Sequence, residues 1–180
     1  MKATGIVRRI DDLGRVVIPK EIRRTMRIRE GDPLEIYTDA DGEVIFKKYS
    51  PIGELAQFSA QYCEVLSRAT NLPVLITDRD HVVTCNGISK KDTIDRRISE
   101  ELEELIESRS IYIASDTEKR ELFALKGSDK LVAVAYPIIG SGDVSGAVVL
   151  MRGEENLYPN PTDIKLTQVA ATFLGKQTEE

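Results

Sequence analysis

Apolar and polar residues alternate in short runs along the first fifty positions of the chain. Residues 4–10 and 15–18 predict two short strands, joined by a turn over 11–14 that contains two aspartates and a glycine. Pro19 suits the first position of a helix, which the Gly-Asp-Pro of residues 31–33 ends after about two turns. The alternation then resumes on either side of an Asp-Ala-Asp-Gly sequence, which is typical of a hairpin.

These elements can bury little apolar surface on their own, because four short strands and one short helix make a very small domain. Domains of this size need a further source of stability, such as disulfides, a metal or oligomerisation. The segment has no cysteine and no cluster of metal ligands. We therefore expect residues 1–50 to fold as an obligate dimer, with strands exchanged between the two chains.

A helical repeat opens the second segment. Apolar residues recur at intervals of 3, 4, 3, 4 and 3, the spacing that keeps one seam of a helix against a partner helix: Leu55, Phe58, Tyr62, Val65, Ala69 and Leu72. The repeat is short for a free coiled coil. Two interpretations stay open: a linking and oligomerisation helix over residues 51–72, or packing of this face on the adjacent domain.

The following residues, 73–180, alternate between strand and helix patterns. Strands are expected at 73–77, 82–85, 122–125, 131–139 and 144–151, and helices over 98–106 and after residue 160. This order predicts an α+β domain with one antiparallel sheet flanked by helices. The sequence thus divides into a mainly-β domain (1–50), a linking helix (51–72) and an α+β domain (73–180).

Charge changes where the patterns change. Residues 1–48 hold 11 basic and 9 acidic side chains, whereas residues 49–180 hold 14 and 21. Pro51 and Gly53 lie at this break, as expected for a domain boundary. The first thirty residues carry nine Lys or Arg against four Asp or Glu, in a chain of net charge −5. Such a basic surface is typical of a domain that binds a polyanion, the alternative being a solvated charged face.

Other classes of protein find little support in the sequence. Its apolar runs are too short for a membrane span or a secretory signal, so we expect a cytoplasmic protein. Cys63 and Cys85 suit reduced, packed thiols rather than a disulfide or a metal site. The single histidine, His81, falls in an expected turn, and the sequence carries no nucleotide-binding or hydrolase motif. We expect no enzymatic activity, no metal and no cofactor.

The first segment closely resembles the swapped-hairpin DNA-binding domain of the AbrB-type transition-state regulators of bacteria. The resemblance covers about fifty residues and is carried by positions 4–8, 13–19, 23–25 and 34–37. Residues 73–180 resemble a GAF-type sensory domain, most clearly at 73–87 and 137–150. The family does not use a helix-turn-helix, in agreement with a short helix that no second helix follows before the hairpin.

The resemblance implies an interleaved dimer that presents arginines to double-stranded DNA. The positions that match the family's DNA-contacting arginines are Arg8, Arg15, Arg23 and Arg24, with Arg9 beside them. The sequence adds two further groups to this region: Arg27 and Arg29, which we expect to be ordinary solvated charges, and Lys2, Lys47 and Lys48, which could extend the surface.

The whole chain resembles regulators of spore development that activate and repress transcription. This resemblance implies a homo-oligomer in the cytoplasm of the forespore. The N-terminal domains would form dimers, and a tetramer would close if the helix of residues 51–72 joined different partners. The GAF-like domain would serve oligomerisation or sense a small-molecule effector within residues 86–115. The alternative function is an antitoxin-type interaction protein that shares the swapped-hairpin fold and carries a short, disordered tail.

Overall fold

The computed structural model describes residues 4–117, 120–153 and 158–179 and divides into two compact units. Unit 1 comprises Met1–Tyr49 and unit 2 comprises Ser50–Glu180. None of the helices in the described ranges is long and apolar enough to cross a membrane.

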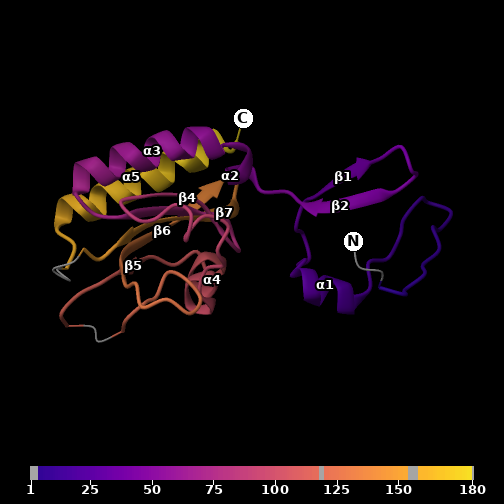
Figure 1. Ribbon diagram of the computed structural model, residues 1–180, viewed down its shortest axis with the longest axis horizontal. Helices are drawn as coiled ribbons and strands as arrows, with labels where there is room; N and C mark the ends of the chain where they lie inside the picture. Colours follow the sequence, from indigo (N-terminus) through magenta and orange to yellow (C-terminus); the bar gives the residue numbers. More distant parts are fainter. Residues whose placement is uncertain (1–3, 118–119, 154–157, 180) are drawn as a thin grey trace. The chain divides into compact units, whose positions relative to one another are not determined.

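Unit 1 contains one short helix, α1 (Lys20–Met26), and one hairpin, β1 (Leu34–Thr38) with β2 (Val44–Lys48) (Figure 1). The helix follows Pro19, whose missing N–H costs nothing at a helix start. The two strands pair antiparallel, with Ile36 opposite Phe46. The hairpin and a short helix after Pro19 are therefore confirmed, but the helix ends at Met26, before a left-handed Arg27, and not at the Gly-Asp-Pro of residues 31–33.

The two N-terminal strands expected at 4–10 and 15–18 are wrong for the single chain. These residues form no strand, although the turn between them is present, with the Gly14 N–H donating to the Asp11 carbonyl at 3.0 Å. Gly14 has a φ of +75°, which glycine adopts without strain. A strand needs a neighbour to satisfy its backbone groups, and residues 4–49 of one chain supply no strand that pairs with this segment.

Unit 2 is built on one antiparallel sheet in the order β4-β3-β7-β6-β5. Its strands are β3 (Val74–Thr77), β4 (Val82–Asn86), β5 (Tyr112–Ile113), β6 (Val132–Gly140) and β7 (Asp143–Met151). The sequence patterns did not predict the short edge strand β5. The strand expected at 122–125 is wrong: this segment makes only isolated bridges, Phe123 to Leu131 and Leu125 to Ile98.

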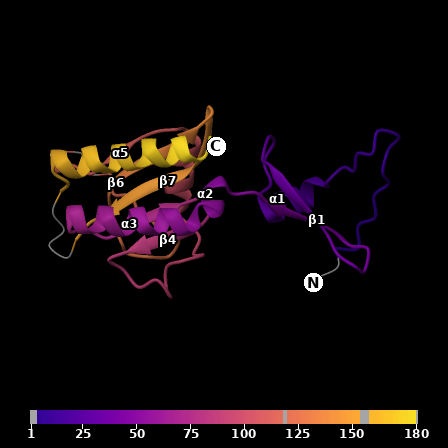
Figure 2. The same ribbon diagram turned by 90° about the horizontal axis from the view of Figure 1, so that it is seen from above.

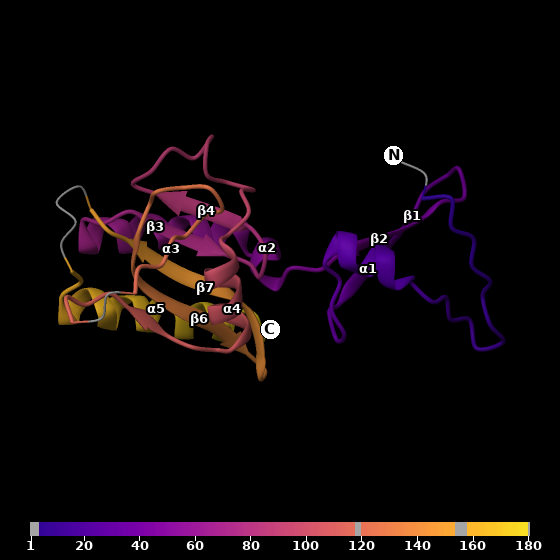
Figure 3. The ribbon, with the colours of Figure 1, turned by 90° about the horizontal axis from the view of Figure 1, so that it is seen from below.

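Helices cover both faces of this sheet, as expected for an α+β, GAF-like domain. Figures 1 and 2 show α3 (Ala56–Thr70) and α5 (Pro161–Gln177) side by side on one face, and Figure 3 shows α4 (Glu100–Glu107) on the other. A one-turn helix, α2 (Pro51–Glu54), precedes α3.

Local sequence signals set the starts of two of these helices. Asn160 and Asp163 form a reciprocal capping box at the start of α5, and the Ser99 hydroxyl accepts from the Leu102 N–H at the start of α4. At the other end of α5, a Cβ on Gly175 would lie 2.1 Å from the Ile139 carbonyl oxygen. Glycine there lets the helix pack closely on β6.

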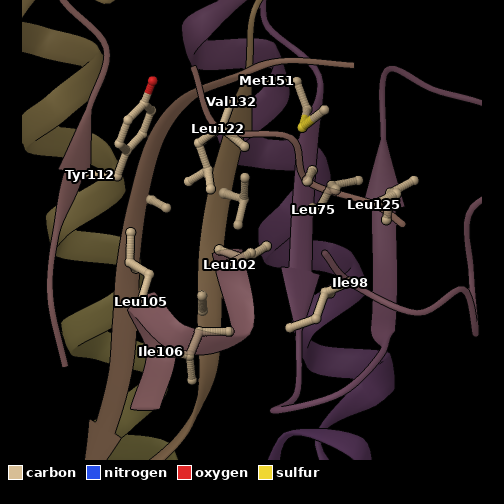
Figure 4. Packing of buried hydrophobic residues seen from close by; sticks show 14 of the residues in the cluster. Leu75, Ile98, Leu102, Leu105, Ile106, Tyr112, Leu122, Leu125, Val132 and Met151 are labelled. Carbon is tan, nitrogen blue, oxygen red and sulfur yellow. The ribbon is translucent and has the colours of Figure 1, made fainter. Parts of the chain in front are cut away.

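The alternation along each strand divides the apolar side chains of unit 2 between two cores. Val74 and Ile76 point to the face covered by α3 and α5, whereas Leu75 points to the face covered by α4. The core on the face covered by α4 also contains Leu122 and Leu125, from the segment before β6 (Figure 4). Because all five side chains are at most 2% exposed, unit 2 has the interior of an independently folded domain.

We predict that neither thiol reacts in the folded protein. Burial raises the pKa of the Cys63 thiol to about 12 and also raises the pKa of Cys85. Since the thiolate is the nucleophile, a disulfide reagent at pH 8 should titrate no thiol in the folded protein and both thiols after unfolding in urea. One equivalent reacting rapidly without urea would contradict the prediction.

The same shift makes a pH prediction. Above pH 9.0, its ordinary pKa, Cys63 loses its proton in the unfolded chain, whereas the folded state keeps it up to about pH 12. The free energy of unfolding therefore carries its full contribution from Cys63 below pH 9.0 and loses it progressively as the pH rises toward about 12. The free energy of unfolding of the wild type should therefore fall relative to that of Cys63→Ala as the pH rises above 9.0. A constant difference across this range would contradict it.

Candidate nucleic-acid interface

The five candidate arginines lie on three segments of unit 1. Arg8 and Arg9 belong to the irregular segment that precedes the turn, Arg15 follows the turn, and Arg23 and Arg24 lie in α1 (Figure 1, indigo). All five side chains are exposed. Unit 1 therefore offers guanidinium groups to solvent from the N-terminal segment, from the turn and from the helix.

Asp11 holds the turn that presents Arg15. One oxygen of its carboxylate accepts the backbone N–H groups of Leu13 and Arg15, and the other accepts from Arg15 Nε at 2.8 Å. These hydrogen bonds, the backbone bond from Arg15 foremost, lower the pKa of Asp11. Asp11 and Arg15 are four residues apart across an Asp-Asp-Leu-Gly turn, a spacing that could have predicted their ion pair from the sequence but was not used.

Helix α1 ends in a two-bond motif at a left-handed residue. The Ile28 N–H donates to the Arg23 carbonyl at 2.8 Å, the Arg27 N–H donates to the Arg24 carbonyl at 3.3 Å, and Arg27 has a φ of +51°. No residue of the helix is buried. The arginines of α1 are thus carried by a helix that the core of its own chain does not hold in place.

The neighbouring basic residues differ from one another in their surroundings. Arg27 and Arg29, expected as solvated charges, are only partly exposed. The Lys47 ammonium lies over the Tyr37 ring, 4.5 Å from its centroid. Lys48 donates to the Arg27 carbonyl at 3.1 Å, and Lys2 lies outside the described residues.

Unit 1 also exposes most of its apolar side chains. Among residues 4–49 only Pro19 is buried, whereas Val7 is 86% exposed and Val17 is 71% exposed. The exposed set covers the N-terminal segment, α1 and both strands: Ile6, Val7, Ile10, Leu13, Val16, Val17, Met26, Ile36, Tyr37, Val44, Phe46 and Tyr49. A soluble domain rarely leaves so many large apolar side chains open to water, so their exposure indicates a protein interface.

The apolar repeat on α3 lies beside the buried face of that helix. Ser59, Cys63 and Leu66 face the sheet, whereas the predicted seam is half-buried or exposed: Leu55, Phe58, Tyr62, Val65 and Ala69. Core packing, the interpretation left open, therefore applies to part of the repeat, because Phe58, Tyr62 and Leu72 pack against the core beneath α3 and α5. Val65 and Ala69 are the exposed members of the repeat.

Helix α5 extends this accessible surface. The Phe173 ring lies 5.6 Å from the Tyr62 ring and 5.8 Å from the Phe58 ring, centroid to centroid. Val65 on α3 is 64% exposed, and Val169 on α5 is also exposed. We call these five residues the α3/α5 ridge. The sequence reasoning did not include the two α5 residues, although their apolar character within an exposed helix face was a usable signal.

Part of the segment expected to hold an effector contributes to the apolar core of unit 2. Within residues 86–115, Leu102 and Ile106 of α4 are fully buried, and they pack with Leu122 and Leu125 against the sheet (Figure 4).

A shallow groove lies on the surface of unit 2. Its lining comes from the start of the unit, the β3–β4 turn, β4 and the segment after β4, and includes Ser50, Gly53, Asp78, His81 and Asp95. Asp95 falls within residues 86–115, where the sequence predicts an effector. The described part of the chain holds no group of three or more His, Cys, Asp or Glu side chains placed to bind a metal ion.

Comparison with protein families divides the chain near the boundary between the units. Residues 54–179 match the family described as stage V sporulation protein T C-terminal, transcription factor. Residues 7–53 match the family described as antidote-toxin recognition MazE, bacterial antitoxin.

Individual relatives agree with this division. The chain is 49% identical over 180 residues to stage V sporulation protein T of Bacillus subtilis, across the full length of both proteins. Over 51 residues, 28% of this chain and 52% of the relative, it is 65% identical to the transition state regulatory protein AbrB of the same organism.

A solved structure adds a likeness of fold alone. The type II free methionine-R-sulfoxide reductase of Thermoplasma acidophilum is 11% identical, with a TM-score of 0.52 over 69% of this chain and 94% of that one. The family is decided by the full-length match and by the C-terminal domain: the chain belongs to the stage V sporulation protein T family of transcription factors.

Proposed function

We propose that this transcription factor binds double-stranded DNA through Arg8, Arg9, Arg15, Arg23 and Arg24 of an interleaved unit 1 dimer. The observation that carries the proposal is the coexistence, on one small unit, of exposed arginines and an apolar surface that its own chain leaves open. The relative AbrB is by name a transition state regulatory protein, and it matches this unit. In this proposal the regulator activates and represses genes of spore development, in the cytoplasm of the forespore.

The exposed apolar side chains support the dimer. Segments 4–10 and 15–18 carry strand-like sequence and form no strand in the single chain. Pairing with the same segments of a second chain would satisfy their backbone groups and cover Val7 and Val17 together. An exchange of this kind is self-complementary, so it closes a two-fold dimer.

The chemistry of arginine suits this surface. Its planar guanidinium meets two phosphate oxygens at once and also reaches guanine O6 and N7 in the major groove. A dimer doubles each arginine, which spreads the positive charge along the duplex. Few of these residues would give a fixed base code, so we propose that DNA shape and deformability contribute to the selection of operators.

The α3/α5 ridge supports a tetramer. Val65, Val169 and Phe173 are exposed on two adjacent helices of unit 2, and Phe173 lies against the half-buried rings of Phe58 and Tyr62. If this surface joins one pair of chains and unit 1 joins a different pair, four chains close into one assembly. In this assembly unit 2 serves oligomerisation.

An antitoxin-type interaction protein is the second candidate, which the family matched by residues 7–53 favours. Such proteins neutralise a toxin with a short, disordered tail, whereas unit 2 of this chain has a sheet and two apolar cores. Limited proteolysis distinguishes the candidates, because a folded unit 2 yields a resistant fragment that begins near Ser50.

Replacing Arg23 or Arg15 by alanine should weaken DNA binding without unfolding the protein. Eight phosphate contacts per dimer, from Arg8, Arg15, Arg23 and Arg24, give a slope of log K against log salt of about −7, and loss of one arginine per chain reduces its magnitude by about 2. We expect a loss of affinity on the order of tenfold, measured by fluorescence anisotropy on a promoter duplex at several salt concentrations. Arg68→Ala, on α3 of unit 2, is the matched control.

Two results would count against this role. A wild-type slope near −1 would mean that few arginines meet phosphate, by the same relation of about 0.9 per contact. A large fall in the melting temperature of Arg23→Ala would make that arginine structural.

Replacing Val65 by glutamate should divide the tetramer into dimers while DNA binding by unit 1 persists. The charge would be placed on the α3/α5 ridge, where Val65 is 64% exposed and can change without opening the core. Ile111→Glu, at a 53% exposed apolar residue beside the edge strand, is the matched control. Sedimentation velocity at micromolar concentration measures the oligomeric state. If Val65→Glu is still a tetramer, the α3/α5 ridge is not the tetramer interface.

A further inference from the structure

Three segments of unit 1 meet at the ammonium group of Lys48. This residue is the last of β2, and its Nζ donates to the Arg27 carbonyl, just past the end of α1, at 3.1 Å. The same Nζ lies 3.7 Å from an oxygen of the Asp32 carboxylate. The hairpin, the end of the helix and the turn that joins them are thus connected through one side chain.

Asp32 is the most enclosed charged group in this network. Its side chain is only 3% exposed, and its Oδ2 also accepts the Arg29 N–H at 2.8 Å. A carboxylate so enclosed must keep its cationic and N–H partners, because losing one leaves a charge that water cannot fully reach. The Asp32 carboxylate, in the turn between helix and hairpin, thus restrains the Lys48 ammonium.

The end of α1 benefits from this ammonium in two ways. The carbonyl groups at a helix C-terminus lack partners within the helix and carry partial negative charge, so a cation there is favourable. Arg27 is also held at a φ of +51°, a conformation that L residues adopt at a cost. Because no residue of α1 is buried, polar contacts of this kind hold the helix against its own hairpin.

We infer that Lys48, held by Asp32, is a positioning residue of the DNA-binding surface: it fixes the end of α1, and with it Arg23 and Arg24, instead of contacting a phosphate itself. The test of this inference by DNA affinity rests on the proposed function. The inference gives Lys48 a role that Lys47 does not share, since the Lys47 ammonium lies over the Tyr37 ring.

The first test needs no DNA and uses the full chain. Hydrogen exchange of the Arg27 and Ile28 amides, which donate to carbonyls of α1, reports the opening of the helix end. In Lys48→Met and in Asp32→Asn we expect both amides to exchange faster, on the order of tenfold. Lys48→Arg, which keeps a cationic donor, should restore most of the protection.

Two controls accompany this measurement. Lys47→Met removes the neighbouring charge and should leave both amides unchanged. The Ile76 amide in the sheet of unit 2 should exchange alike in every variant, which shows that the effect is local. Unchanged exchange at Arg27 and Ile28 in Lys48→Met would overturn the inference.

The second test is a double-mutant cycle on DNA affinity at several salt concentrations. If Lys48 positions the helix, Lys48→Met and Asp32→Asn each weaken binding, the double variant is no weaker than either, and the salt slope keeps its wild-type value. Lys47→Met should combine additively with Asp32→Asn. If Lys48 instead meets phosphate, Lys48→Met lowers the slope by about 2 per dimer while Asp32→Asn tightens binding, and the inference fails.

The two tests also distinguish this inference from the proposed function. A wild-type protein that does not bind DNA overturns the proposed function and the positioning role together. If DNA is bound and the exchange of the α1 amides does not respond to Lys48, only the positioning role fails.

Discussion

The burial of apolar side chains in unit 1 is the constraint on which the other features depend. A single chain leaves Val7 and Val17 more than two-thirds exposed and buries only Pro19 among residues 4–49. Burial contributes about 25 cal/mol for each Å² of apolar surface removed from water, so a partner that covers this surface supplies stability that the chain alone lacks. The dimer that we propose is thus the completion of a fold as well as a binding arrangement.

Unit 2, in contrast, buries its apolar side chains within a single chain. Its sheet separates two apolar cores, and its helices cover both faces, so its interior is closed within one chain. Its exposed apolar side chains include Val65, Val169 and Phe173 of the α3/α5 ridge, where Phe173 contacts the half-buried rings of Phe58 and Tyr62. In the assembly that we propose, the two units use different apolar surfaces: that of unit 1 completes a fold, and the α3/α5 ridge joins domains that are already folded.

Local signals made much of the fold predictable from the sequence. Asn160 and Asp163 at the start of α5, Pro19 before α1 and the glycine turn between β6 and β7 act over a few residues, and these elements are confirmed. The N-terminal strands are absent from the single chain because a strand depends on a neighbour, which the sequence analysis expects from a second chain.

The remaining parts of the site depend on contacts between distant positions. Asp32 and Lys48 are 16 residues apart and carry no shared motif, and Phe173 meets Tyr62 across more than 100 residues. The candidate arginines came from resemblance to a family, and the structure adds the partners of Arg15 and the end of α1.

Thermal unfolding of the full chain at a series of protein concentrations tests the central claim most directly. If unit 1 folds by pairing with a second chain, the midpoint of its transition rises with concentration, since association is linked to folding. Hydrogen exchange of the β1–β2 hairpin amides assigns that transition to unit 1. A hairpin transition that stays at one temperature over a hundredfold dilution, with the chain monomeric throughout, would contradict the account.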